Sequence, residues 1–203
     1  MKVSVIRTGL SNLGSMVRAL EQCGADVAVC AKASDLQHAD RVVLPGVGAF
    51  NEAMQRLDRE GFSDAIRDHA ARERPLLGVC LGMQLLAEEG EEMGLSAGLG
   101  LVPGRVVPLR PNADDERLPH MGWNEVRSQR PDPLLRDIQD GADFYFVHSF
   151  HFEARSRDDV IATTPYCGGF ASAVGRDAVF GVQFHPEKSA RAGARLLANF
   201  LAA

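Results

Sequence analysis

Cys80 lies in the glycine-flanked motif GVCLG, residues 78–82, directly after a run of apolar residues. The pattern is a cysteine version of the nucleophile elbow, in which a strand turns sharply into a helix and presents the side chain of the central residue. Free N–H groups and the positive end of the helix dipole would favour the thiolate there. The Leu81 N–H would face an oxyanion formed on a substrate carbonyl. The alternative is a buried cysteine in a glycine-rich turn, so the interpretation depends on a base elsewhere in the chain.

A cysteine nucleophile requires a general base and a group that orients the base. His185 stands in the segment GVQFHPEKS, residues 181–189, at the end of an apolar strand pattern, where α/β proteins usually build their sites. In an extended chain, residues two apart face the same way, so Glu187 would lie beside the His185 ring and fix its tautomer. Pro186 disfavours a helical conformation at His185. Alone, this would be a solvent-exposed pair in a turn; with Cys80 it predicts a Cys–His–Glu triad.

Polar residues near Cys80 are candidates for binding a substrate. Gln84 follows Cys80 by one helical turn and could hydrogen-bond a substrate held over the thiol. Acidic residues crowd the expected C-terminal end of the same helix: Glu88, Glu89, Glu91 and Glu92. Most are expected to be solvated, but one carboxylate turned inward could bind a substrate ammonium group. The loop PGVG, residues 45–48, could complete an oxyanion hole or be a plain connection.

The elements that must position these residues alternate between strand and helix in the first half of the chain. Strands are predicted at 3–6, 26–30, 41–45 and 76–79, and helices from Asn12 to about Cys23, at 50–59, at 63–72 and at 81–89. This alternation is typical of a parallel sheet covered on both faces. Short strands follow at 104–109, 123–127, 144–148, 160–163, 170–174 and 179–184, and a last helix covers 189–202 from a capping Ser189. We therefore expect one α/β domain over residues 1–203, with a mostly parallel sheet and a partly antiparallel second half.

Composition excludes several classes of function. The 203 residues carry a net charge of −5 with no basic block, which argues against a nucleic-acid or anionic-membrane surface. No window approaches the roughly 20 apolar residues of a membrane span, and the N-terminal apolar run is too short for a signal peptide. The four cysteines form no C-x-x-C pair and no zinc-ligand spacing. We expect a soluble, cytoplasmic protein with free thiols, no metal and no cofactor.

Several segments together resemble the class I, or triad, glutamine amidotransferases. They are SNLGS 11–15, LPGVGAF 44–50, LGVCLGMQLL 77–86, PHMGWN 119–124, FYFVHSF 144–150 and FGVQFHPEKS 180–189. GVCLGMQ and FHPE mark the wider class. LPGVGAF, PHMGWN and YFVHS are similar, more narrowly, to the glutaminase subunits of imidazole glycerol phosphate synthase, an enzyme of histidine biosynthesis.

The resemblance implies a flavodoxin-like, doubly wound fold and the hydrolysis of glutamine to glutamate and ammonia. By this resemblance Cys80 attacks the side-chain amide to form a glutamyl thioester. His185 takes the thiol proton and delivers it to the departing ammonia, while Glu187 orients His185. The resemblance also assigns glutamine contacts to Gly48, Gln84, Glu92 and Ser149, and oxyanion donors to Leu81 and, through a peptide flip in PGVG, to Val47.

The family passes ammonia to a (β/α)₈ cyclase subunit in a heterodimer. That partner converts a phosphoribulosyl-formimino nucleotide into imidazole glycerol phosphate and an aminoimidazole carboxamide ribotide. Segments that the family uses at this interface contain Met121, Trp123, Tyr145 and Lys188. From the residues alone, Trp123, the only tryptophan, could be an exposed anchor or a core residue, and the core would be preferred without the resemblance. His148 and His151 are expected to be structural or interface residues.

Two regions depart from the family pattern. Arg7 and Thr8 stand where many relatives carry acidic and aromatic residues, and Phe150 stands where a tyrosine is usual. Three other functions remain open at this point. They are a glutaminase serving another synthase, such as that of pyridoxal phosphate, a catalytically silent scaffold subunit, and a γ-glutamyl hydrolase-like peptidase that acts without a partner.

Overall fold

Parallel strands form the first half of the sheet. The computed structural model describes residues 2–7, 13–114 and 116–203. The parallel strands are β1 (Lys2–Ile6), β2 (Asp26–Cys30), β3 (Arg41–Gly46), β4 (Leu76–Cys80) and β13 (Val179–Val182). Their order in the sheet is β2-β1-β3-β4-β13, and every neighbouring pair is parallel. This is the order of a flavodoxin-like sheet, so the expected fold class is confirmed.

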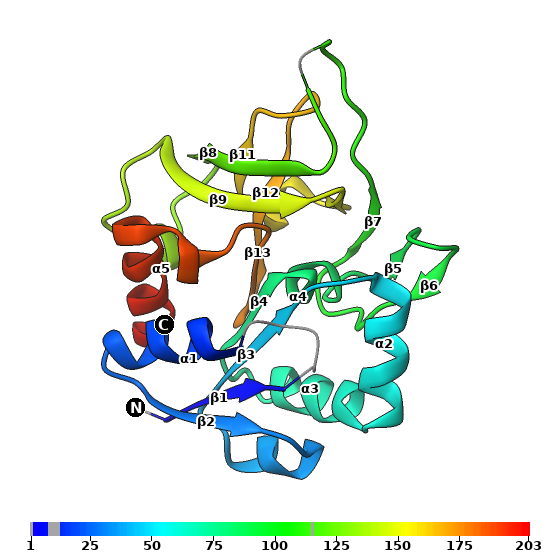
Figure 1. The fold of residues 1–203 in the computed structure, drawn as a ribbon. Helices are drawn as coiled ribbons and strands as arrows, with labels where there is room; N and C mark the ends of the chain where they lie inside the picture. The colour runs from blue at the N-terminus through cyan, green and yellow to red at the C-terminus, as the bar shows by residue number, and fades with distance from the viewer. Residues whose placement is uncertain (1, 8–12, 115) are drawn as a thin grey trace.

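Helices cover both faces of this parallel half (Figure 1). One face carries α1 (Leu13–Gln22) and α5 (Ala190–Ala202), and the other carries α2 (Phe50–Arg59) and α3 (Phe62–Ala71). Successive strand residues point to opposite faces, so Val43 packs in the cluster with α1 and α5, whereas Val42 and Leu44 pack in the cluster with α2 and α3. The apolar runs predicted as buried strands are therefore buried from both sides.

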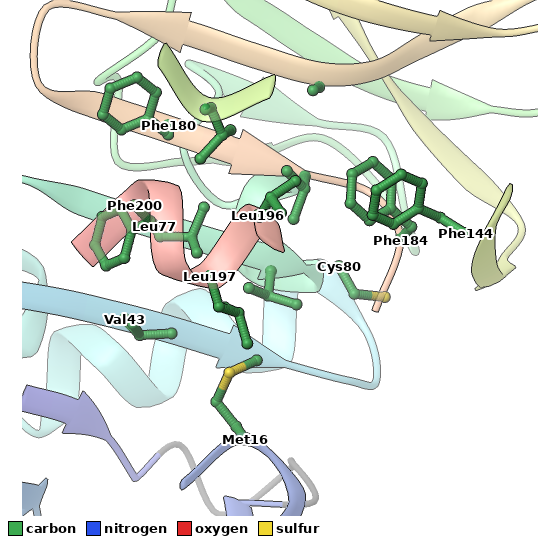
Figure 2. Packing of buried hydrophobic residues seen from close by; sticks show 14 of the residues in the cluster. Met16, Val43, Leu77, Cys80, Phe144, Phe180, Phe184, Leu196, Leu197 and Phe200 are labelled. Atoms are coloured by element: carbon green, nitrogen blue, oxygen red, sulfur yellow. The ribbon is translucent and has the colours of Figure 1, made fainter. Parts of the chain in front are cut away.

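The cluster under α5 leads directly to the end of β4. Figure 2 shows Leu196, Leu197 and Phe200 of α5 packed over the central strands, and the Cys80 side chain at the edge of this packing. Because this core is close-packed, the position of Cys80 at the end of its strand is held by the sheet rather than by a loop.

The second half of the chain is largely antiparallel, as expected. Its strands are β5 (Glu89–Gly90), β6 (Ser96–Ala97), β7 (Gly104–Pro108), β8 (His120–Ser128), β9 (Ala142–His148), β10 (Phe150–Ala154), β11 (Val160–Thr164) and β12 (Phe170–Arg176). β12 pairs antiparallel with β13 and extends the sheet through β10, β7, β5 and β6, and β11 connects β12 to the ribbon of β8 and β9. The strands β5, β6 and β10 were not predicted.

The helix predicted over 81–89 is wrong beyond its first turn. The helix α4 covers only Leu81–Gln84, after which the chain turns and Glu89 enters β5. The cause is tertiary: the Glu88 N–H donates to the Gly104 carbonyl at 3.0 Å, and β5 pairs with β7. These long-range backbone bonds outweigh the helical pattern of the local sequence.

Two predicted helix caps have different outcomes. Ser189 does not cap α5 with its side chain. Its hydroxyl donates to the His185 carbonyl at 2.6 Å and accepts from the Tyr145 N–H at 3.0 Å, so it joins α5 to the strand ribbon instead. The predicted cap Asn12 lies outside the described residues, as does Thr8.

Short 3₁₀ helices complete the chain, namely η1 (Ala33–His38), η2 (Pro133–Leu135), η3 (Arg157–Asp159) and η4 (Pro186–Lys188). No helix in the described part of the chain is long and apolar enough to cross a membrane.

Candidate active site

Cys80 occupies the sharp turn that its motif predicts. It ends β4 and precedes α4, with φ of 55° and ψ of −114°, a backbone conformation that non-glycine residues rarely adopt. The flanking glycines make the turn possible. A Cβ on Gly82 would lie 1.8 Å from the Leu44 carbonyl oxygen, and one on Gly78 would lie 2.5 Å from the Gly82 carbonyl oxygen. The elbow therefore packs backbone on backbone against β3.

His185 and Glu187 form a buried pair beside this elbow. The Nδ1 of His185 lies 2.9 Å from Oε1 of Glu187, and each side chain is 6% exposed. The predicted pairing is present, but not by extended-chain alternation: Glu187 lies in the 3₁₀ turn η4, with His185 in extended conformation just before it. The His185 N–H also donates to the Tyr145 carbonyl at 2.9 Å, which fixes the backbone of the histidine to β9.

The environment of His185 favours its protonated form. Burial lowers the pKa of His185, but the Cys80 sulfur and the Glu187 carboxylate raise it by more, to about 9. The other ring nitrogen, Nε2, makes no aligned hydrogen bond to any described residue. Because Nδ1 is engaged with Glu187, Nε2 is the atom that could take a proton from the thiol, and such contacts commonly tighten only when substrate is bound.

A pocket of about 430 Å³ opens over the thiol, a volume suited to a small molecule. Its lining contains Cys80 together with all the residues expected to contact substrate or an oxyanion: Val47, Gly48, Leu81, Gln84, Glu92 and Ser149. Pro119, Val147, His148 and Phe150 complete it. Residues from distant parts of the chain thus converge on one cavity.

Glu92 is the acidic residue that turns inward. Its Oε2 accepts a 2.7 Å hydrogen bond from the Phe50 N–H at the start of α2, so the dipole of that helix supports the carboxylate. Glu88 instead forms an ion pair of 2.7 Å with Arg155, and Glu91 lies 3.6 Å from Arg105. The sequence indicated that one of these carboxylates could turn inward, and Glu92 does. The four acidic residues do not crowd the end of a helix, because α4 already ends at Gln84.

Gln84 is held by the protein through its amide nitrogen. Nε2 donates to the Phe150 carbonyl and to Oε1 of Gln183, both at 3.0 Å, which leaves the Gln84 carbonyl oxygen to accept from a substrate. Sequence reasoning missed Gln183, a fully buried residue whose Nε2 lies 3.8 Å from the Cys80 sulfur. Its only signal was a polar residue within an apolar strand.

The residues expected at a partner interface gather on one surface made by the β8 and β9 ribbon and the adjoining end of η4, here called the β8–β9 face. It consists of Met121, Trp123, Tyr145 and Lys188. Met121 is 66% exposed and Trp123 is 55% exposed, so the tryptophan is a surface residue and not part of the core. The Trp123 and Tyr145 rings meet edge-on with their centroids 6.1 Å apart. The Lys188 Nζ lies over the Tyr145 ring, 5.4 Å from its centroid.

The β8–β9 face adjoins the pocket. Met121 pairs with Val147 in the ribbon, and the Val147 carbonyl lies 3.9 Å from the Cys80 sulfur. Within the described ranges, no group of three or more histidine, cysteine or acidic side chains is arranged to hold a metal ion.

Replacing Glu187 with glutamine is expected to lower the pKa of His185 from about 9 toward its usual range. The amide removes a carboxylate charge that favours the imidazolium, so the titration midpoint should move down by roughly one pH unit or more. The measurement is an NMR titration of the His185 ring. Glu60→Gln, which alters a surface pair with Arg56, should leave the midpoint in place. An unchanged midpoint in Glu187→Gln would show that the carboxylate does not set the protonation of the ring.

Known proteins share the sequence pattern and the fold of this chain. The family model for glutamine amidotransferase class-I matches residues 4–203. The chain is 47% identical to the imidazole glycerol phosphate synthase subunit HisH of Moorella thermoacetica, over 98% of this chain and 93% of the relative. It is 45% identical to the subunit HisH of Chlorobaculum tepidum, over 95% of each chain. The structure of PurLQS from Thermotoga maritima is similar in fold, with a TM-score of 0.78 at 18% identity, covering 99% of this chain and 97% of that one. The chain therefore belongs to the class-I glutamine amidotransferases and, within them, to the HisH subunits of imidazole glycerol phosphate synthase.

Proposed function

We propose that this chain is the glutaminase subunit of imidazole glycerol phosphate synthase and that Cys80, His185 and Glu187 are its catalytic triad. The observation that carries the proposal is the strained elbow, which presents Cys80 to a pocket with a buried, oriented histidine beside it. Such a site suits acyl transfer from an amide, because it offers a nucleophile, a base and backbone N–H donors without a metal.

The chemical steps follow from the positions of these atoms. Nε2 of His185 has taken the Cys80 proton before substrate binds, as the raised pKa of His185 favours, and the thiolate attacks the side-chain carbonyl carbon of glutamine. The oxyanion accepts from the Leu81 N–H, and from Val47 after a peptide flip in the loop that contains Gly48. The imidazolium then gives its proton to the leaving nitrogen, which departs as ammonia and leaves a glutamyl thioester. His185 then deprotonates a water molecule, which attacks the thioester carbonyl. The carbon–sulfur bond breaks, glutamate leaves, and the Cys80 sulfur is free again.

The pocket provides groups for the remaining polar atoms of glutamine. The Glu92 oxygen that is not bonded to α2 would bind the α-ammonium group. The Gln84 side-chain carbonyl would accept a hydrogen bond from the substrate amide. Ser149 and Gly48, which also line the pocket, would contact the bound glutamine. No cofactor is needed, because each step uses only proton transfer and attack by sulfur or water.

The β8–β9 face supplies a surface for the cyclase subunit. Tryptophan, tyrosine and methionine are enriched in protein interfaces, and tryptophan and tyrosine are frequent anchors. Because this face adjoins the pocket, a heterodimer formed there would pass ammonia to the partner's synthase site without release to solvent. The four cysteines are free thiols, which fits a reducing cytoplasm as the site of this reaction.

The test is glutamate release by the purified chain, alone and with the cyclase subunit and its nucleotide ligand. We expect low activity alone and activation of at least roughly tenfold in the loaded complex, equal to about 1.4 kcal/mol in the barrier. Bovine serum albumin in place of the cyclase subunit is the control. Rapid glutamate release by the isolated chain, unaffected by the cyclase, would contradict the assignment and favour a stand-alone γ-glutamyl hydrolase.

A further inference from the structure

Two buried histidines, His120 and His148, form a hydrogen-bonded pair beside the pocket. Nδ1 of His120 lies 3.0 Å from Nε2 of His148, and Nδ1 of His148 lies 2.8 Å from the Phe150 carbonyl oxygen. A carbonyl only accepts, so Nδ1 of His148 carries the proton and its Nε2 must accept from His120. Nε2 of His120 then accepts from the Asn124 amide at 3.2 Å. The direction of every bond in this chain is therefore determined.

Burial keeps both rings in the neutral form that this direction requires. Burial lowers the pKa of His120 to about 4 and that of His148 to about 3. A neutral imidazole donates through one nitrogen and accepts through the other, whereas a protonated ring would only donate. At neutral pH each ring thus serves as a relay between one donor and one acceptor.

The pair is connected to the thiol through a shared backbone carbonyl. The Phe150 oxygen that accepts from His148 also accepts from Nε2 of Gln84 at 3.0 Å. Gln84 donates in turn to Gln183, whose Nε2 lies 3.8 Å from the Cys80 sulfur. One continuous set of hydrogen bonds thus runs from Asn124 on β8 to the elbow.

The same strand carries the proposed partner surface on its other side. Successive strand residues face opposite sides, so His120 and Asn124 lie on the inner side of β8, whereas Met121 and Trp123 lie on the exposed side. His120 and His148 are cross-strand partners in the ribbon, so a displacement of the ribbon that accompanies contact at the β8–β9 face would carry both rings together. The Phe150 carbonyl and the Gln84 amide would then move with them.

We propose that His120 and His148 are positioning residues for glutamine, which fix the Gln84 amide and couple its position to strand β8. This inference rests on the proposed function, since it names Gln84 as a substrate contact. It concerns hydrogen bonding and not the bulk of the rings, and the two contributions can be separated by substitution at His120.

The test compares His120→Phe with His120→Asn. The His120 ring centroid lies 4.1 Å from that of Tyr166 and 4.8 Å from that of Phe146. Phenylalanine keeps a ring at this position but cannot donate to His148. Asparagine loses the stack but places an amide N–H near the position of Nδ1. Tyr166→Phe is the matched control, because Tyr166 contacts the same ring while its hydroxyl, among the described residues, bonds with the Arg117 backbone alone, donating to the carbonyl and accepting from the N–H.

Two readouts are expected to agree. In the ligand-loaded complex with the cyclase, His120→Phe should raise KM for glutamine by roughly threefold to tenfold, the usual effect of one lost hydrogen bond, with a smaller change in kcat. His120→Asn and Tyr166→Phe should stay within about twofold of the unsubstituted chain. The dissociation constant of glutamine, measured by calorimetry in a Cys80→Ala background where no turnover occurs, should change in parallel. Thermal melting and cyclase affinity establish that each variant is folded.

Equal KM and affinity for His120→Phe and the unsubstituted chain would overturn the inference. Equal losses in His120→Phe and His120→Asn would also overturn it, because restoring an N–H donor at this position would then not restore glutamine binding. If the unsubstituted complex releases no glutamate, the proposed function fails instead, whereas the calorimetric comparison still decides whether the histidine pair positions glutamine.

Discussion

Replacing Cys80 with alanine is expected to abolish glutamate release, lowering kcat/KM in the activated complex by roughly 10⁴-fold or more. The thioester cannot form without the sulfur, and removal of a catalytic nucleophile has effects of this size in comparable triads. The substitution removes one buried sulfur at the edge of the core, so the chain should stay folded and should still bind the cyclase subunit. Steady-state assays and a binding titration on the same sample separate the two effects.

Cys23→Ala is the matched control for this experiment. Burial raises the pKa of the Cys23 thiol, whose sulfur donates to the Ala194 carbonyl at 3.4 Å, so it is a protonated packing residue outside the pocket. Its replacement should leave kcat/KM within about twofold. Substantial turnover by Cys80→Ala would mean that another group attacks the amide, and the triad assignment would fail.

Replacing Gly82 with alanine is expected to destabilise the chain by about 3 kcal/mol or more, enough to unfold a marginally stable protein. The added Cβ would lie 1.8 Å from the Leu44 carbonyl oxygen and 2.9 Å from its carbonyl carbon. These are backbone atoms of a buried central strand, so the clash cannot be relieved by a side-chain rotation. Urea denaturation followed by circular dichroism measures the loss as a lower midpoint.

Gly14→Ala provides the comparison, because Gly14 lies in α1 and a Cβ there meets nothing closer than the Arg18 guanidinium at 3.5 Å. Alanine favours the helix, so this variant should be more stable by roughly 0.5 kcal/mol. A Gly82→Ala protein as stable as Gly14→Ala would show that the elbow can open away from β3, and the close packing would not be what holds Cys80 in place.

The parts of the site that could be predicted are those encoded by local pattern. Apolar runs ending at Cys80 and near His185 indicated two parallel strands, and β4 and β13 are indeed direct neighbours in the sheet. The glycines of the elbow indicated a turn that only small residues allow. The fold class followed from the same alternation of strands and helices, since each element carries its own periodicity.

The parts that could not be predicted depend on contacts between distant segments. The helix after Gln84 ends early because β5 pairs with β7, a contact that the local pattern does not report. Gln183 reads as a polar interruption in a strand until the fold places it against Cys80. Trp123 could have been core or surface, because its role depends on which side of β8 is covered.

The acceptor that joins Gln84 to His148 is a main-chain carbonyl, and this has a consequence for how residue 150 varies. The oxygen that accepts both hydrogen bonds belongs to the peptide group, so a tyrosine in place of Phe150 would offer the same acceptor. The side chain at position 150 can therefore be exchanged while the peptide oxygen still accepts both hydrogen bonds. An alanine at position 150 would test only the side chain, which lines the pocket, whereas an ester in place of the amide between residues 150 and 151 would weaken that oxygen as an acceptor and reveal its role.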